Sequence, residues 1–469
     1  MGNAIYQIEV WTKEQLQKKR ATIHHGRRHQ YFFFPVQENF HIQQYPQIML
    51  IQNEILGQNP SPNIGNFNTF NDNGHNNIGF NNNLNNNFNY NFINNTNNNF
   101  NNNNINNNFI NAQTNTSQEH LRGLVNIAST CYMNSTIQCF AHVKELFVYF
   151  QKPKMQQLIN SPAYDQKLFP VFAELISYMW DSNNSSPLYP NIFKDKLGQI
   201  NPLFQGAMPN DAKDLLTFLL MQLHEELNNP DNNNRKKNVM VNQEMQQNKE
   251  AMLKQFASFF RHNYRSIMSE LFYGLTYNQT ICQSCNVSLY NYQTFNFLIF
   301  PLSEVLKHKM QSVNFKSNFN NTVTLEECFQ YNQVFTNLTD YYCNKCKHTS
   351  LARYANFLSA LPNILIIILN RGVGLQYKVN IDFEENLDLR NYVEYFKESS
   401  FYELFGVVTH YGESGASGHF MARCKSPFEE CWFLYNDAIV SKIGYFTKEE
   451  FFRGNPYILF YKKTKFANQ

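Results

Sequence analysis

Two patterns of apolar and polar residues follow one another within residues 119–466, the part of the chain with a globular composition. In the first part, apolar residues recur every three to four positions, which predicts amphipathic helices over 135–150, 168–180 and 211–227. The later part consists of short runs rich in β-branched and aromatic residues, bounded by Gly, Pro, Asn and Asp, which predict strands. These runs cover 289–302, 363–371, 404–411, 418–425, 432–437 and 457–463. We therefore predict an α+β fold, with helices first and a sheet later, that is large enough to contain subdomains.

The third helical segment has a predicted start, and a polar stretch follows it. Pro209 or Asn210 marks the start, because Asp211 and Asp214 then lie in the first turn, where the helix dipole favours acidic side chains. Residues 228–250 are polar and rich in Asn and Gln, which predicts a mobile insertion within the folded domain.

The chain before residue 119 has a different character. Residues 1–57 form a mixed N-terminal segment to which the pattern assigns no role. Residues 58–118 are rich in Asn, which accounts for 20 of the 30 residues from 81 to 110. Asn side chains compete with backbone hydrogen bonds and favour turns, so we predict a disordered linker without chemistry of its own.

Charge and cysteine content narrow the class of protein. The 469 residues include 39 basic and 36 acidic side chains, a balance that argues against a dedicated nucleic-acid binder. No run of 18 apolar residues occurs, so we expect no membrane span, and the N-terminus lacks the apolar core of a signal peptide. The nine cysteines are an odd number, which fits a reducing compartment. We expect an intracellular protein of the cytoplasm, the nucleus or both.

The segment GLVNIASTCYMNSTIQCF, residues 123–140, places Cys131 between a run of small residues and an amphipathic helix. At a helix N-terminus, free amides and the dipole stabilise a thiolate, the form that attacks a carbonyl carbon. The same N–H groups, together with the side-chain amide of Asn126, would stabilise the oxyanion that results. Cys139 lies in mid-helix among apolar neighbours and is interpreted as a core residue. Without further evidence Cys131 would also be interpreted as a core residue, so the prediction that it is a nucleophile depends on the partners described next.

A glycine-rich loop precedes His419, and a second predicted strand ends at Asn436 and Asp437. Two adjacent antiparallel strands would bring residue 436 back beside residue 419. An Asn or Asp oxygen in that position fixes the imidazole tautomer, so that the free ring nitrogen faces the thiol. We predict His419 as the general base; the local competitor is His410, which precedes the glycine loop.

Two Cys-x-x-Cys pairs, Cys282 with Cys285 and Cys343 with Cys346, give a second chemical signal. Four thiolates from two tight turns form the closed tetrahedral shell of a structural Zn²⁺ ion. The alternatives are one incidental pair, disulfides, or His348 in place of Cys346. A catalytic zinc ion is disfavoured, because all four ligands come from the protein.

The segment around Cys131 resembles the Cys box of the ubiquitin-specific proteases, the papain-like deubiquitinases, whose pattern is GLxNxGNTCYMNSxLQ. The segment around His419 is similar to their His box, GHYxxY followed by Wxx(F/Y)(N/D)D. Similar pieces lie between the two boxes: PNDAKDLLTFLL, SELFYGLTYNQTICQSC, LPNILIIILNR and YKVNIDFEENLDL, with YILFYKK at the end. The resemblance covers residues 119–466.

This resemblance implies a papain-like cysteine protease fold with a helical thumb, a β-sheet palm, and fingers at 272–350 that carry the zinc site. It also implies hydrolysis of the isopeptide bond between the ubiquitin C-terminal glycine and a substrate lysine. The implied roles are nucleophile for Cys131, general base for His419, orienting residue for Asn436 and oxyanion donor for Asn126, with Asp437 as a secondary polar residue. The implied partners are ubiquitin and ubiquitinated proteins.

The chain departs from the family pattern at several positions, none of which removes a catalytic group. Ala128 and Ser129 replace Gly-Asn, and an Ala there would strain a turn that Gly makes freely. The other departures are Pro209, Asn210, Met221, Gly372 and Phe420.

Two other classes of function remain in view. An inactive ubiquitin-binding scaffold would explain the changes at 128, 129 and 221, although Cys131, His419 and Asn436 are intact. A zinc-ribbon nucleic-acid module draws some support from Lys345, Lys347, His348 and Arg353 beside the second cysteine pair. The sequence identifies neither the substrate protein nor an activating subunit, and a ubiquitin-like modifier would fit the same pattern.

Overall fold

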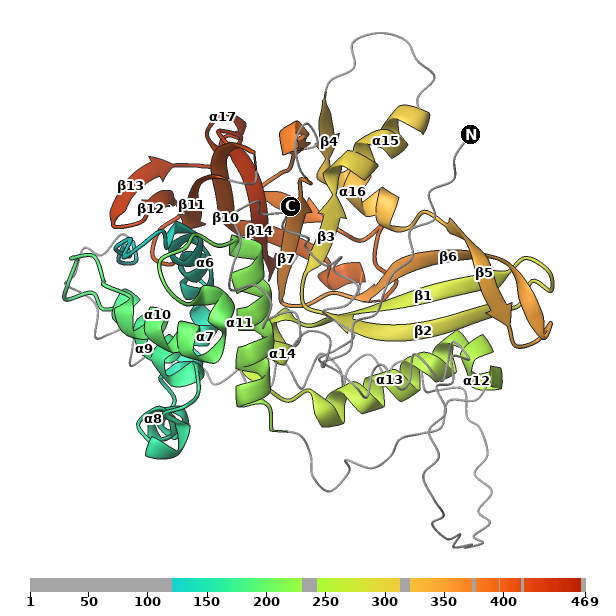
Figure 1. Ribbon diagram of the computed structural model, residues 1–469, viewed down its shortest axis with the longest axis horizontal. Coiled ribbons are helices and arrows are strands. Elements are labelled where there is room, and N and C mark those ends of the chain that lie inside the picture. Colours follow the sequence, from blue (N-terminus) through green and yellow to red (C-terminus); the bar gives the residue numbers. More distant parts are fainter. Residues whose placement is uncertain are drawn as a thin grey trace, which may run out of the picture. The chain divides into compact units, whose positions relative to one another are not determined.

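The computed structural model of the chain describes residues 120–229, 243–312, 321–372, 377–395, 397–414 and 417–464. The predictions for 1–57 and 58–118 lie outside the described residues, as does most of the insertion predicted at 228–250. None of the helices in these described ranges is both long and apolar enough to cross a membrane. Helices dominate the first part of the described chain and strands the second, as the apolar pattern predicts (Figure 1).

A helical part surrounds the segment that contains Cys131, and it corresponds to the thumb. Every residue of its first helix, α6, is buried, so this helix runs through the interior and not along a surface. The predicted helical run over 135–150 is interrupted at His142 and Val143, and a separate helix follows. The helices of this part are α6 (Cys131–Ala141), α7 (Lys144–Phe150), α8 (Pro153–Ile159), α9 (Phe169–Met179), α10 (Asn191–Ile200), α11 (Ala212–Leu227) and α14 (Ile267–Phe272).

The start of α11 differs from the prediction. Its N-cap is Asp211, not Pro209 or Asn210, because the Asp211 carboxylate accepts a hydrogen bond from the backbone N–H of Lys213 at 2.8 Å. The second carboxylate oxygen of Asp211 accepts a hydrogen bond from the hydroxyl of Tyr457 at 2.8 Å. The residue that caps the helix therefore also attaches it to the last strand of the chain.

An eight-stranded sheet forms the centre of the fold and corresponds to the palm. Its order is β13-β12-β11-β10-β14-β7-β3, with β9 paired to β10. Neighbours are antiparallel except β3 and β7. The strands are β3 (Leu298–Pro301), β7 (Ile364–Asn370), β9 (Asn386–Asp388), β10 (Phe401–Ser414), β11 (Ser417–Lys425), β12 (Trp432–Asn436), β13 (Ile439–Gly444) and β14 (Asn455–Thr464).

β7 explains why one run of the sequence is continuously apolar. The even-numbered residues from Ile364 to Ile368 face one hydrophobic core, which contains α6 and the other thumb helices. The odd-numbered residues from Leu365 to Leu369 face a second core on the other side of the sheet. A strand buried on both faces has no polar alternation, so the central sheet separates two cores.

A four-stranded antiparallel sheet of order β2-β1-β6-β5 forms the fingers (Figure 1). Residues 243–250, predicted as part of a mobile loop, are instead largely helical and pack against β2. The prediction fails there because tertiary contacts stabilise this polar segment: Gln246 is buried, and the helix that contains it packs against β2. The elements are α12 (Gln243–Gln247), α13 (Lys249–Asn263), β1 (Gly274–Cys282), β2 (Ser288–Phe295), β5 (Thr336–Cys343) and β6 (His348–Ala360).

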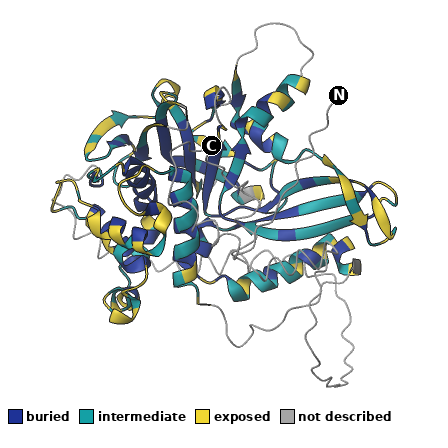
Figure 2. Cartoon of the chain, in the orientation of Figure 1, coloured by how far each residue is buried: buried dark blue, intermediate teal, exposed yellow. Residues whose placement is uncertain are grey.

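The remaining elements cover the second core. Thr324 and Glu327 form a reciprocal capping box, in which each side chain bonds the backbone N–H of the other residue, at the start of α16. Leu325, Cys328 and Phe329 of this helix are buried in the second core. The elements are α15 (Leu302–Ser312), α16 (Leu325–Asn332), α17 (Lys448–Phe451), β4 (Thr322–Thr324) and β8 (Asn380–Asp382). Figure 2 shows that burial concentrates in the central sheet and α6.

Candidate active site and cysteine cluster

Cys131 is the first residue of α6 and is 8% exposed. The helix begins there because the carbonyl of Thr130 accepts the backbone N–H groups of Met133 and Asn134, both at 2.9 Å. The loop ahead is closed by Asn126, whose side-chain oxygen accepts the backbone N–H of Thr130 at 3.0 Å. The prediction that this thiol lies at a helix N-terminus is confirmed.

Two residues of this loop have backbone conformations that L side chains disfavour. Ala128 has φ of 153° and Ser129 has φ of 49°. These are the positions where the family pattern has Gly-Asn, the residue types that adopt positive φ most readily. Ala128 and Ser129 therefore hold a backbone conformation that costs strain energy.

The expected stabilisation of a thiolate at Cys131 is wrong for the resting protein, because the net effect of its surroundings is to favour the neutral thiol. Burial raises the pKa of Cys131, and the negative charge of Asp437 raises it further. A hydrogen bond from the backbone N–H of Phe420 has the opposite effect on this pKa. Phe420 follows His419 directly on β11, and β11 packs against α6, so the sulfur lies next to the strand that carries the predicted base.

His419 and Asn436 lie together at the ends of two neighbouring antiparallel strands, β11 and β12. His419 Nε2 is 2.7 Å from Asn436 Oδ1. Because a carbonyl oxygen can only accept, Nε2 carries the proton and Nδ1 is the free nitrogen. The expected return of residue 436 to residue 419 is confirmed.

Asp437 occupies a left-handed backbone conformation, with φ of 53°, and its side chain is only 14% exposed. One carboxylate oxygen accepts from Asn134 Nδ2 at 2.8 Å, and the other accepts from Asn126 Nδ2 at 3.0 Å. The second oxygen is also 3.9 Å from His419 Nε2. The five predicted catalytic residues thus gather around the start of α6. Asn134 joins them; the sequence offered a signal for it, since it lies in the same CYMNS motif as Cys131.

His410, the competitor of His419, is an interior residue. It is 3% exposed, burial lowers its pKa, and its Nδ1 hydrogen-bonds the hydroxyl of Tyr377. A Cβ atom at Gly418 would lie 2.4 Å from His410 Nε2, so only glycine leaves room for this ring. His410 therefore supports the loop that leads into His419.

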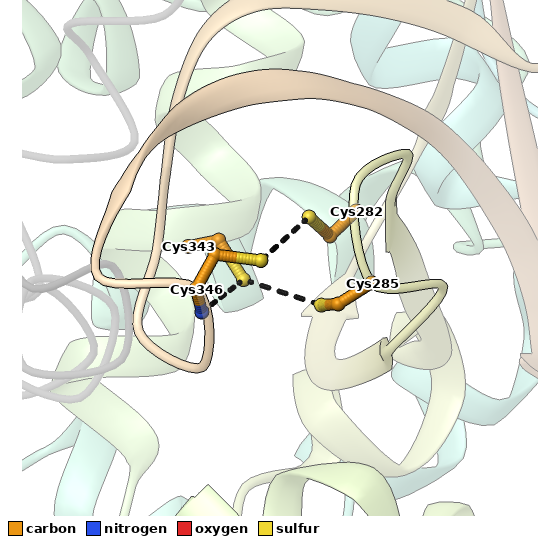
Figure 3. Close-up of side chains that lie close together, drawn as sticks. All are labelled: Cys282, Cys285, Cys343 and Cys346. Carbon is orange, nitrogen blue, oxygen red and sulfur yellow. Dashed lines mark hydrogen bonds between the residues drawn. The ribbon is translucent and has the colours of Figure 1, made fainter.

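The four predicted metal ligands form a single cluster at the far end of the fingers. Their sulfur atoms all lie within 4.8 Å of one another, and the β1–β2 hairpin supplies two while the β5–β6 hairpin supplies the others (Figure 3). Cys282 Sγ is 3.9 Å from Cys346 Sγ, and Cys285 Sγ is 3.7 Å from Cys343 Sγ. All nine cysteines are free thiols, so the disulfide alternative is wrong, and the cluster contains Cys346, not His348.

The backbone of each turn is shaped for a metal ion. In each Cys-x-x-Cys turn the residue after the second cysteine has positive φ, 55° at Asn286 and 63° at Lys347. The N–H of that residue bonds the carbonyl of the first cysteine, at 2.9 Å for Asn286 and 2.7 Å for Lys347. A Zn–S bond of about 2.3 Å gives a tetrahedral S···S edge of about 3.8 Å, which matches the two measured separations. These four cysteines therefore fit a tetrahedral metal ion.

Comparison with known families gives a match over most of the described chain. The family model for ubiquitin carboxyl-terminal hydrolases matches residues 122–461.

Curated relatives are similar over the same region. Drosophila melanogaster ubiquitin carboxyl-terminal hydrolase Usp2 is 26% identical over 360 residues, which is 76% of this chain and 36% of the relative. Ubiquitin carboxyl-terminal hydrolase 4 of Saccharomyces cerevisiae is 27% identical, covering 73% of this chain and 39% of the relative. The human hydrolase 2 is 25% identical, covering 75% of this chain and 56% of the relative. The match thus spans about a third to somewhat over half of the length of these relatives.

Solved structures with a similar fold include two deubiquitinating (DUB) modules. The SAGA Ubp8/Sgf11/Sus1/Sgf73 DUB module bound to ubiquitin aldehyde has a TM-score of 0.52 and 24% identity, covering 76% of this chain and 73% of that chain. A yeast SAGA DUB module with a mutant Sgf73 has a TM-score of 0.53 and 21% identity, covering 76% and 72%. At these identities the similarity concerns the fold.

Proposed function

Because this chain belongs to the ubiquitin carboxyl-terminal hydrolase family, we propose that it cleaves the bond between the C-terminal glycine of ubiquitin and a lysine of a substrate protein or of another ubiquitin. The main support is the family match over residues 122–461, which includes Cys131, His419 and Asn436. The geometry gives further support: His419 is hydrogen-bonded to Asn436, and the strand that carries His419, β11, packs against α6. Ubiquitin and ubiquitinated proteins are the proposed partners.

In the proposed mechanism Cys131 is the nucleophile. Since burial raises the pKa of its thiol, the sulfur needs a base to become a thiolate. The free Nδ1 of His419, oriented by Asn436, accepts that proton. The thiolate attacks the carbonyl carbon of the terminal glycine, and the C–N bond to the lysine breaks as His419 returns the proton to the leaving amine. Water, deprotonated by His419, then hydrolyses the thioester.

Developing negative charge on the carbonyl oxygen requires donors at the start of α6. The free amides of the first helical turn point there, and Asn126 is the proposed side-chain donor. One N–H of Asn126 is bonded to Asp437, so the other N–H is the one available to the oxyanion. Asp437 therefore holds the amide while leaving a donor free.

We further propose that Cys282, Cys285, Cys343 and Cys346 bind one structural Zn²⁺ ion. With all four positions taken by protein sulfur, the ion would supply no open site for chemistry; it would join the two finger hairpins. The cluster lies at the turns of the β1–β2 and β5–β6 hairpins, and these strands lie on the other side of the central sheet from α6 in the view of Figure 1.

An inactive ubiquitin-binding scaffold is the second candidate. The observation in its favour is the strained loop before Cys131, with Ala128 and Ser129 at positive φ. Strain of this kind costs about 1–3 kcal/mol per residue and could displace the oxyanion donors.

Hydrolysis of ubiquitin carrying a C-terminal fluorogenic amide separates the two candidates. We expect turnover by the wild-type chain and none by Cys131→Ala. Cys139→Ala is the matched control, because Cys139 is a buried thiol on the same helix and should retain activity. Binding of ubiquitin without turnover would favour the scaffold. Turnover that survives Cys131→Ala would refute Cys131 as the nucleophile.

A further inference from the structure

Asn134 lies one helical turn beyond Cys131 on α6 and is 2% exposed. Its side-chain nitrogen is 2.8 Å from Asp437 Oδ1 and within 3.2 and 3.3 Å of the carbonyl oxygens of Leu124 and Val125. A single amide group therefore joins the nucleophile helix, on which it lies, to two other parts of the chain: the segment that leads into Asn126 and the residue after Asn436.

The orientation of the Asn134 amide follows from its neighbours. All three contacted atoms are acceptors, so the flipped amide would put oxygen against oxygen at each of them. With the nitrogen facing them, the buried Oδ1 has no hydrogen-bond partner among the residues that the structure describes. An unsatisfied buried oxygen costs about 1–3 kcal/mol. The amide therefore carries one unsatisfied atom, and the contacts of Asn134 are all made by its nitrogen.

The nitrogen of Asn134 fixes the carboxylate of Asp437 from one side. The other side of this carboxylate accepts from the Asn126 amide, the proposed oxyanion donor, and lies 3.9 Å from His419 Nε2. The backbone carbonyl of Asp437 also accepts the N–H of Leu124 at 3.0 Å. Asp437 is therefore bonded to residues 124–126 through both its backbone and its side chain. Without Asn134, the carboxylate could rotate and pull the Asn126 amide away from the oxyanion.

We infer that Asn134 is a positioning residue for the transition state: it holds Asp437 so that Asn126 keeps one N–H directed at the developing oxyanion. This role rests on the proposed hydrolase function. It predicts an effect on kcat and not on ubiquitin binding, because Asn134 is buried under the site and offers no surface to ubiquitin. It also predicts that loss of the Asn134 side chain lowers kcat only when the Asp437 side chain is present.

Gln138 offers a matched control on the same helix. It is 1% exposed, its Nε2 donates to the carbonyl of Arg122 at 2.8 Å, and its Oε1 is likewise without a partner among the described residues. It therefore shares with Asn134 a buried amide that ties α6 to the preceding segment. It differs in making no hydrogen bond to Asp437 or Asn126 among the described residues, so its substitution measures the structural cost alone.

The experiment is a double-mutant cycle on the full chain, with kcat and KM measured on ubiquitin C-terminal fluorogenic amide and folding checked by thermal unfolding. For Asn134→Ala we expect kcat to fall about tenfold or more with KM unchanged within about twofold. Asn134→Ala combined with Asp437→Ala should be no slower than Asp437→Ala alone, because both changes break one linkage. Gln138→Leu should leave kcat within about twofold.

Three outcomes would overturn the inference. The first is additive loss of kcat in the double mutant. The second is an equal loss of kcat in Gln138→Leu at matched Tm. The third is a rise of KM in Asn134→Ala without a fall of kcat. An inactive wild-type chain would instead refute the proposed function. In that case ubiquitin affinity, measured for Asn134→Ala and wild type, would still test whether Asn134 is irrelevant to binding.

Discussion

At the scale of single residues, the loop before Cys131 has positive φ angles at residues whose side chains disfavour them. Ala128, with φ of 153°, lies in a region that glycine enters at little cost and alanine does not. The surrounding hydrogen bonds, above all those to Asn126 Oδ1, hold the loop in this shape. The strain is therefore stored beside the nucleophile, where relief of it should be measurable.

Ala128→Gly should raise the free energy of unfolding by about 1 kcal/mol, since the relieved strain exceeds the extra entropy that glycine gives the unfolded chain. Chemical denaturation of both proteins measures this difference. Ala207→Gly, in an exposed loop and without positive φ, is the control and should lower stability slightly. If both substitutions destabilise equally, Ala128 is not strained.

Residue-scale contacts were only partly predictable from the sequence. The pair His419–Asn436 follows from two adjacent strands joined by a short turn, so pattern and spacing suffice to find it. The contact between Asn134 and Asp437 joins positions 303 residues apart through side chains. Neither hydrophobic period nor turn chemistry encodes such a contact, which depends on how the helix is seated against the sheet.

At the scale of elements, a regular apolar pattern predicts the secondary structure well. An element that depends on tertiary contacts for its stability is not predicted by its pattern. β7 was identifiable as a strand because its apolar run is short and bounded by Pro362 and Arg371, although only the structure reveals two cores. Residues 243–250 look like loop in isolation and become helical against β2. The cysteine pairs lie between these extremes, since their spacing predicts a shared ion but not the hairpins that present them.

Those hairpins give the prediction that belongs to this scale. The cysteine cluster joins β1–β2 to β5–β6, two hairpins separated in sequence by the elements of the second core. Cys285→Ser should therefore abolish bound zinc, measured by elemental analysis, and lower Tm, because the closure of a long loop is lost.

Cys328→Ala serves as the control for the zinc prediction. Cys328 is fully buried in the second core, so its truncation lowers Tm while the zinc content stays at about one ion per chain. Zinc that persists in Cys285→Ser, or that is absent from the wild type, contradicts the assignment of the cluster.

At the scale of the whole described molecule, the helical part and the central sheet are joined through buried polar contacts as well as apolar ones. His142, at the end of α6, donates from Nδ1 to the Gln138 carbonyl at 2.7 Å and accepts at Nε2 from the Tyr435 hydroxyl of β12 at 3.2 Å. His224 of α11 bonds Ser266, the N-cap of α14, at 2.7 Å. Both histidines serve as neutral rings where elements meet.

This arrangement makes folding sensitive to acid. Burial lowers the pKa of His142 and of His224 to about 4, from an ordinary value of 6.5. Between these values the unfolded chain binds more protons than the folded one, so their contribution to stability is complete above about pH 6.5 and is lost as pH falls toward 4. Each shift corresponds to about 3 kcal/mol at its limit, which is a sizeable part of the stability of a typical domain.

Denaturation by urea at a series of pH values tests this coupling. In wild type the free energy of unfolding should fall steeply from pH 6.5 to pH 4.5. His142→Gln and His224→Gln should each be less stable at pH 7.5, because a hydrogen bond is disturbed, but should lose less stability per pH unit below 6.5. The slope must decrease in both buried-site variants if acid acts through these contacts. An unchanged slope would mean that acid acts instead through other titratable groups.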